Sequence, residues 1–133
     1  MSDPVWVSRA ALELLHDESL KEHGGAEGLR ESGLLDSALA RAQNLFAYEE
    51  VTDACRLAAT YAFGIVKNHP FVDGNKRAAF IAAGLFLQMN GARLHADRAE
   101  AVLVMLDLAS GELTELQFAE WLRKNTRPKD LGK

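Results

Sequence analysis

Apolar residues recur at helical spacing along most of the chain, with glycine or polar residues between the runs. Apolar side chains at i, i+3, i+4 and i+7 form one face of an α-helix, so each run predicts a helix. Six helices follow from this pattern. Their apolar positions are Leu12, Leu15 and Leu20; Leu34, Leu35, Ala38, Leu39, Ala42 and Leu45; Leu57, Ala58, Tyr61 and Ile65; residues 78–87; residues 101–109; and Phe118, Trp121 and Leu122.

Residues that begin and end helices flank the same runs. Side-chain oxygens at a helix start accept hydrogen bonds from free N–H groups, and glycine commonly ends a helix. The start signals are Ser8, Thr52, Asp97 with Glu100, and the capping box of Thr114 with Gln117. The stop signals are Gly24 with Gly25, Gly91 and Gly111. The fourth helix, over residues 75–90, is apolar almost all round, which predicts that other helices surround it.

Only two short segments favour extended backbone, residues 5–7 and residues 93–95. The predicted fold class is therefore all-α: a compact bundle of about six helices with at most a short hairpin or flap. No repeat or linker divides the chain, so we expect a single domain over residues 1–127. Residues 128–133 are expected to form a disordered tail.

Composition narrows the possible partners and the compartment. The chain has 133 residues, 48% hydrophobic and 26% charged, which suits one soluble domain. The net charge of −4 argues against direct binding of nucleic acid or acidic membrane lipid. Cys55 is the only cysteine, so no internal disulfide can form, and we expect it to be buried. The polar N-terminus does not resemble a signal peptide, and the longest apolar stretch falls short of the ~20 residues that span a bilayer. We expect a cytoplasmic protein.

The run from His69 to Arg77, HPFVDGNKR, concentrates the candidate chemistry. It reads as a loop that opens the fourth helix, where free backbone N–H groups favour an anion. Lys76 and Arg77 add two cations at the same positive helix end, which predicts an anionic ligand, most simply phosphate. Asp73 could hold Mg²⁺ through one carboxylate oxygen, and His69 could take a proton from a hydroxyl group.

Each of these residues also has a structural interpretation. His69 could end the third helix and Asp73 could be a turn residue, while Phe71 is expected to anchor the loop in the core. Gly74 allows positive φ and close approach to phosphate, and Asn75 could cap the fourth helix, bind phosphate, or do both. The whole set in one run favours the functional interpretation.

The same run matches the motif His-x-Phe-x-(Asp/Glu)-(Gly/Ala)-Asn-(Gly/Lys)-Arg of the Fic/Doc family, and the chain resembles its Doc (death-on-curing) toxin branch. The resemblance covers roughly residues 5–123. Further segments that carry it are residues 23–25, 48–53, 59–61, 84–87 and 90–91.

The resemblance implies a Fic/Doc domain, with His69 as the general base and with ATP and Mg²⁺ as co-substrate and metal. Fic enzymes that transfer AMP carry glycine at the position of Lys76, whereas Doc-like members carry lysine and present the γ-phosphate. The resemblance therefore implies a protein kinase of Fic fold. Doc has a basic residue at the position of Lys67, as this chain does. At the position of Ile81 Doc has an asparagine, so one polar contact to the nucleotide is missing or replaced in this chain.

The resemblance also implies protein partners. It places a flap that aligns the target peptide at Phe46, Ala47 and Tyr48, although Tyr48 alone would be interpreted as a core residue. The likeliest substrate is a threonine of elongation factor Tu, whose phosphorylation arrests translation. The inhibitory pattern Ser/Thr-x-x-x-Glu-(Gly/Asn) of other Fic proteins does not occur in the sequence. A separate antitoxin chain of the Phd type is therefore expected to restrain this toxin.

Three alternatives stay open at this point. An AMP transferase would use the same residues with the nucleotide reversed. A metal-dependent hydrolase would need His16, His23, His69 and His95 as ligands, but no zinc-type spacing such as His-Glu-x-x-His occurs. A binding module without catalysis would not need His69, Asp73 and Arg77 together.

Overall fold

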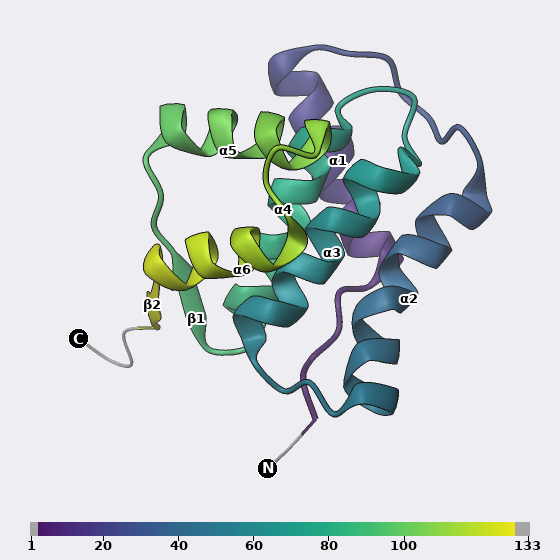
Figure 1. Cartoon of the computed structure of the whole chain (residues 1–133). Coiled ribbons are helices and arrows are strands. Elements are labelled where there is room, and N and C mark those ends of the chain that lie inside the picture. Colours follow the sequence, from purple (N-terminus) through teal and green to yellow (C-terminus); the bar gives the residue numbers. More distant parts are fainter. Residues whose placement is uncertain (1–2, 130–133) are drawn as a thin grey trace.

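The computed structural model describes residues 3–129, and these residues form six helices and two short strands (Figure 1). The all-α class and the helix count predicted from the sequence are confirmed. In chain order, the elements are α1 (Arg9–His23), α2 (Ser32–Glu49), α3 (Ala54–Asn68), α4 (Asn75–Met89), β1 (Ala92–Leu94), α5 (Arg98–Ser110), α6 (Glu115–Lys124) and β2 (Thr126–Pro128).

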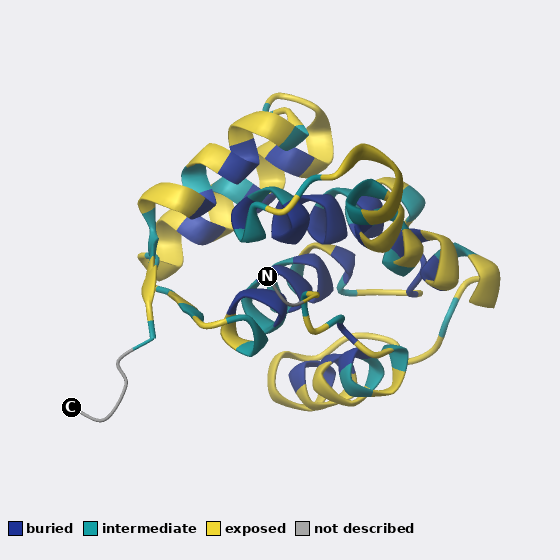
Figure 2. Cartoon of the chain, turned by 90° about the horizontal axis from the view of Figure 1, so that it is seen from below, coloured by how far each residue is buried: buried dark blue, intermediate teal, exposed yellow. Residues whose placement is uncertain are grey.

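Helices α3 and α4 form the centre of the bundle, and the other helices surround them (Figures 1 and 2). α3 packs against α2, α4 and α6, and α4 packs against α1, α5 and β1. α4 buries small residues such as Ala78, Ala79 and Ala82, so its backbone can approach α3 closely. The fully buried rings of Tyr61 and Phe86 lie 5.3 Å apart between the two central helices. The expectation that α4 is surrounded is confirmed.

Most predicted helix ends coincide with the observed ones. The capping box at α6 is complete: the Thr114 Oγ1 accepts from the Gln117 N–H at 3.1 Å, and the Gln117 Oε1 accepts from the Thr114 N–H at 2.9 Å. The expectation at α3 was wrong by one residue. Asp53, not Thr52, is the cap, because its carboxylate accepts from the Cys55 N–H at 3.1 Å.

A short two-stranded sheet, formed by segments on either side of α5 and α6, includes part of the expected tail. β1 and β2 pair antiparallel, with Ala92 opposite Pro128 and Leu94 opposite Thr126. The prediction of a disordered tail from residue 128 was therefore wrong at Pro128, since backbone pairing holds this residue, and the Lys129 N–H donates to the Gly91 carbonyl at 3.0 Å. Residues 130–133 lie outside the described part of the chain.

Residues 5–7 do not form a strand, and several expected burials differ. The Val7 N–H donates to the Tyr61 hydroxyl at 3.1 Å, which ties the N-terminal segment to α3. Leu15 is 38% exposed on the outer side of α1, and Trp121 is only partly buried. Cys55 is buried, as expected. No helix within residues 3–129 is long and apolar enough to cross a membrane.

A polar cluster links α2, α3 and α6 away from the motif. The Glu115 carboxylate pairs with Arg41 and Arg56 and accepts from the Thr60 hydroxyl at 2.8 Å. Burial raises the pKa of Glu115, but these hydrogen bonds and the charge of Arg41 outweigh it and hold the pKa below its usual value. We call these four residues the Glu115 cluster.

Candidate active site

The candidate site is the connection between the two central helices, residues 69–74, which we call the motif loop. It begins at His69, which caps α3 with left-handed backbone (φ 54°), and ends at Gly74, which precedes α4 (φ 76°). Positive φ is uncommon for a residue other than glycine, so the His69 backbone must be held by its surroundings. The His69 N–H donates to the Ile65 carbonyl at 2.9 Å. These two turns bring the start of α4 beside the end of α3.

Arg30 fastens the motif loop from outside. Its Nε donates to the His69 carbonyl at 2.8 Å, and a terminal guanidinium nitrogen donates to the Asn68 carbonyl at 3.0 Å. The Arg30 backbone N–H donates to the Pro70 carbonyl at 2.7 Å. One residue therefore satisfies carbonyls at the end of α3 that would otherwise lack partners, and its cation suits that negative helix end.

Asn75 holds the loop from inside. Its side chain is 5% exposed, accepts from the Phe71 N–H at 2.9 Å and donates to the Phe71 carbonyl at 2.9 Å. These two bonds fix which end of the amide is oxygen, so the remaining Nδ2 hydrogen faces the Nδ1 of His69, 3.1 Å away. Asn75 makes no helix-capping bond, because Gly74 occupies the cap position. The capping interpretation of Asn75 was wrong, and Asn75 instead orients the His69 ring.

Phe71 anchors the motif loop in the core, as predicted. Its ring is 2% exposed and lies against the His16 ring with a centroid separation of 3.9 Å. His16 also touches the end of the loop: a Cβ added at Gly74 would lie 2.9 Å from the His16 Cε1. Burial lowers the pKa of His16, partly offset by the charge of Asp17. The neutral imidazole of His16 therefore packs directly beneath the motif loop.

The outer side of the site carries the charged groups. Asp73 is exposed, and its carboxylate accepts from the Gly74 N–H at 2.8 Å and, more weakly, from the Ala26 N–H at 3.3 Å. Lys76 is exposed and Arg77 partly exposed in the first turn of α4, which contains no acidic residue. Within residues 3–129 neither cation makes an ion pair. Both side chains and the helix start are therefore available to an anion.

The segment between α1 and α2, residues 24–31, runs beside the motif loop, and we call it the pairing loop. Leu29 and Phe71 form an antiparallel bridge, and the Val72 N–H donates to the Gly28 carbonyl at 2.9 Å. From the residue pattern, Gly24 and Gly25 were interpreted as a helix stop, and residues 23–25 as one of the segments that carry the family resemblance. The missed signal was the third glycine, Gly28, since all three have the left-handed φ that an irregular, closely packed loop requires.

The residues predicted to form the flap do not reach this site. Phe46, Ala47 and Tyr48 lie near the end of α2. The start of α2 faces the motif, because the Asn68 amide donates to the Leu34 carbonyl at 3.0 Å. Tyr48 instead lines a cavity with Arg56 at the far end of α3. Tyr48 is 82% exposed, so its interpretation as a core residue was wrong. The segment that pairs with the motif is residues 24–31.

The remaining candidates lie around the motif. Lys67 is exposed on the last turn of α3, with its Nζ 5.8 Å from the centre of the Phe63 ring. Ile81 is partly buried on α4, one turn after Arg77. Among residues 3–129, no three His, Cys, Asp or Glu side chains form a metal-binding group. A Mg²⁺ ion commonly uses one or two carboxylates plus phosphate oxygens and waters, so the exposed Asp73 carboxylate fits that role without a preformed cage.

Comparison with known proteins agrees with this geometry. A family model described as the Fic/DOC family matches residues 6–87. The chain is 35% identical over 118 residues to the protein kinase doc of Escherichia phage P1, covering 89% of this chain and 93% of that protein. It is 44% identical over 78 residues to the toxin Doc of Mycolicibacterium smegmatis, covering 56% of this chain and 58% of that protein.

Proposed function

This chain belongs to the Fic/DOC family, and we propose that it is a Doc-type toxin that transfers the γ-phosphate of ATP to a hydroxyl group of a protein. The observation that carries the proposal is one compact arrangement at the start of α4. An oriented imidazole, an exposed carboxylate and two available cations surround a helix end that favours anions. Phosphoryl transfer needs these groups: a base for the hydroxyl and positive charge for the phosphates.

His69 would take the proton from the attacking hydroxyl, while the γ-phosphoryl group moves to that oxygen and ADP leaves. In the described geometry the His69 Nδ1 accepts from Asn75, so the neutral ring carries its proton on Nε2. The Nε2 of His69 can accept a proton only after Asn75 releases Nδ1 and the ring proton moves there from Nε2. We assign the exchange to phosphate binding, which offers the Nδ2 hydrogen of Asn75 a phosphate oxygen as an alternative acceptor.

Gly74, Lys76 and Arg77 would bind the phosphates. The Arg77 guanidinium can hold two phosphate oxygens at once, Lys76 acts as a point charge, and Gly74 lets the backbone approach. Lys67 would add a further contact at the end of α3. Mg²⁺ on Asp73 would neutralise charge that develops on the phosphate oxygens. Lys76 stands where AMP-transferring relatives have glycine, which is why we favour γ-phosphate transfer over AMP transfer.

The test uses purified protein, Mg²⁺ and bacterial lysate, with ATP labelled at either the γ- or the α-phosphate. We expect γ-label on a protein band and its loss in His69→Ala. His95→Ala is the matched control, because His95 is an exposed histidine beside β1, outside the motif. α-Label on the band would identify an AMP transferase and refute the role assigned to Lys76. A wild-type protein that transfers neither label to any lysate protein would refute the enzyme proposal.

We further propose elongation factor Tu as the substrate and a Phd-type antitoxin as the restraining partner. The names of the two relatives, protein kinase doc and toxin Doc, support a toxin with a separate antitoxin. Expression of the chain alone should stop growth, and expression of the His69→Ala variant should not. Growth that continues at high levels of the wild-type protein would refute the toxin proposal.

A further inference from the structure

A buried imidazole, His16 of α1, lies beneath the motif loop with its polar atoms unpaired. Its side chain is 1% exposed, and neither ring nitrogen has a hydrogen-bond partner within residues 3–129. Polar groups in protein interiors normally have a partner, because burial removes their hydration. A neutral imidazole carries one N–H, so this ring holds a donor that lacks an acceptor in the described geometry.

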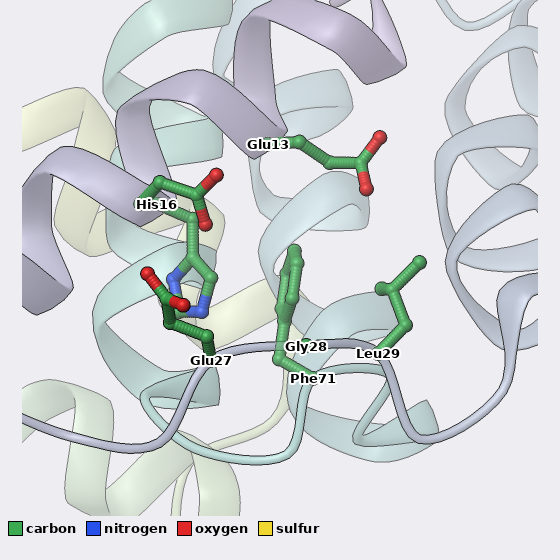
Figure 3. A pocket seen from close by; sticks show the side chains of 7 residues that line it. Glu13, His16, Glu27, Gly28, Leu29 and Phe71 are labelled. Carbon is green, nitrogen blue, oxygen red and sulfur yellow. The ribbon is translucent and has the colours of Figure 1, made fainter.

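The polar edge of the His16 ring faces the peptide that joins Asp73 to Gly74. A Cβ added at Gly74 would lie 2.9 Å from the His16 Cε1 and 3.7 Å from its Nδ1. Cε1 is the carbon between the two ring nitrogens, so the ring packs on this turn with its polar edge. In Figure 3 the His16 ring points from α1 toward the loops, beside the Phe71 ring, whose centroid is 3.9 Å away.

The Asp73 carbonyl is the acceptor in front of this edge. Burial lowers the pKa of His16, whereas the Asp73 backbone acts in the opposite direction. A backbone group that favours the protonated ring must be a hydrogen-bond acceptor, and the carbonyl is the backbone acceptor. The contact falls short of hydrogen-bond geometry, and no backbone N–H within residues 3–129 donates to the Asp73 carbonyl.

One peptide unit carries both the Asp73 carbonyl and the Gly74 N–H. This unit is planar and trans, so its C=O and N–H point in opposite directions. A carbonyl held by His16 beneath the loop therefore aims the Gly74 N–H outward, toward the anion site at the start of α4.

The Gly74 N–H is occupied in the described geometry, because it donates to the Asp73 carboxylate at 2.8 Å. In the proposed reaction a phosphate uses this N–H and Mg²⁺ uses the carboxylate, so nucleotide binding separates the two. The peptide then needs another contact to keep its orientation, and the unpaired donor of His16 is next to its carbonyl.

We propose that His16 is a positioning residue for phosphate binding: its ring N–H donates to the Asp73 carbonyl in the nucleotide-bound state and holds the Gly74 N–H toward a phosphate oxygen. The inference rests on the proposed function and adds a residue of α1 to the phosphate site. Nucleotide binding then forms a hydrogen bond inside the protein, in addition to the contacts with the nucleotide itself.

Nitrogen NMR of the His16 ring tests this bond directly, with the His16→Asn variant used to assign the signals. The probe is β,γ-methylene-ATP with Mg²⁺, which cannot transfer its γ-phosphate, and adenosine with Mg²⁺ is the control. Calorimetry measures binding in the same samples. With the analogue we expect one His16 ring N–H to shift downfield and to exchange with water about tenfold more slowly. Adenosine should cause neither change.

Two results of this experiment would overturn the proposal, and they are distinguishable. If the analogue binds and the His16 ring is unchanged, His16 has no positioning role, while phosphate binding by the motif stands. If the analogue does not bind, the proposed function fails and the role of His16 fails with it.

Substitutions separate positioning from packing. His16→Phe keeps a ring against Phe71 without an N–H, whereas His16→Asn and His16→Gln place an amide N–H near the positions of Nδ1 and Nε2. His16→Phe should raise the KM for ATP and the Kd of the analogue about tenfold and leave the KM for the protein substrate unchanged. One of the amide variants should restore most of the affinity. Ser19→Ala is the matched control, because Ser19 is also buried on α1 with an unpaired side chain, and its variant should bind as the wild type does.

Equal weakening in His16→Phe and both amide variants would show that His16 only packs beneath the loop, and so would equal weakening in Ser19→Ala. Circular dichroism establishes that each variant is folded before binding is compared. If His16→Phe does not fold, the NMR comparison on the wild-type protein decides the question.

Discussion

Asn75 offers the sharpest test of how the candidate site is built. Its buried side chain makes three hydrogen bonds, two to the Phe71 backbone and one to the His69 ring. We therefore expect Asn75→Ala to lower the free energy of unfolding and to release His69 from its fixed orientation.

The magnitude follows from what the truncation leaves behind. Phe71 is 2% exposed, so its N–H and C=O would be buried without partners. Each unpartnered group costs about 1–3 kcal/mol, while water entering the space and the better helix propensity of alanine recover part of this. The net loss should be about 2–4 kcal/mol, a large share of the ~5–15 kcal/mol that stabilises a typical domain.

Urea unfolding followed by circular dichroism measures this loss. Asn125→Ala is the matched control, because the Asn125 amide makes one partly buried hydrogen bond, to the Trp121 carbonyl at 2.8 Å. That variant should lose about 0.5–1.5 kcal/mol. If the two variants lose the same free energy, Asn75 does not hold the motif loop as described.

Nitrogen NMR of the His69 ring gives a second readout. In the wild-type protein the neutral ring should carry its proton on Nε2, because Nδ1 accepts from Asn75. In Asn75→Ala both tautomers should appear. A wild-type ring protonated on Nδ1 would refute the proposed role of Asn75, whatever the stability measurement shows.

Three further predictions concern the loops and the Glu115 cluster. Gly25→Ala should destabilise the fold and reduce label transfer, because its Cβ would lie 2.9 Å from the Asp73 Oδ2 in addition to the backbone strain of positive φ. Gly24→Ala, with nothing within 4 Å, should show only the backbone strain of its φ of 85° and ψ of 166°, about 1–3 kcal/mol, and should leave label transfer unchanged. Arg30→Ala should speed amide hydrogen exchange at Val72, whose N–H bonds the pairing loop, and unchanged exchange would contradict the fastening role of Arg30. Glu115→Gln should reduce the loss of thermal stability that occurs as the pH falls. The folded pKa of Glu115 lies below its usual 4.5, so its contribution is present above about pH 4.5 and is lost as the pH falls through the folded pKa; an equally steep profile would refute this.

The helices and the motif could be predicted from sequence because their signals are local. Apolar spacing within α4 and the capping box of Thr114 with Gln117 act over a few residues. The candidate site was predictable for the same reason: His69 to Arg77 are nine consecutive residues across one helix connection. No long-range contact had to be inferred to bring the imidazole, the carboxylate and the cations together.

The features that sequence reasoning missed depend on contacts between distant segments. The pairing loop bonds the motif loop mainly through backbone groups across some 40 positions, and backbone groups leave no side-chain pattern. β2 was assigned to the tail for a similar reason, since a three-residue strand is defined by its partner. The sequence around Arg30 gives no sign of a structural role. Only the fold shows that its guanidinium binds the free carbonyl groups at the end of α3.

Phe71 explains why the two faces of the motif loop are coupled. Its backbone is bound by Asn75, which also holds the His69 ring, and its side chain packs against the buried His16 ring on α1. Dense interiors transmit displacements, because the neighbouring side chains have little room to absorb them. A change in the packing of Phe71 against His16 should therefore alter the exchange of the Asn75–His69 bond that the proposed reaction requires.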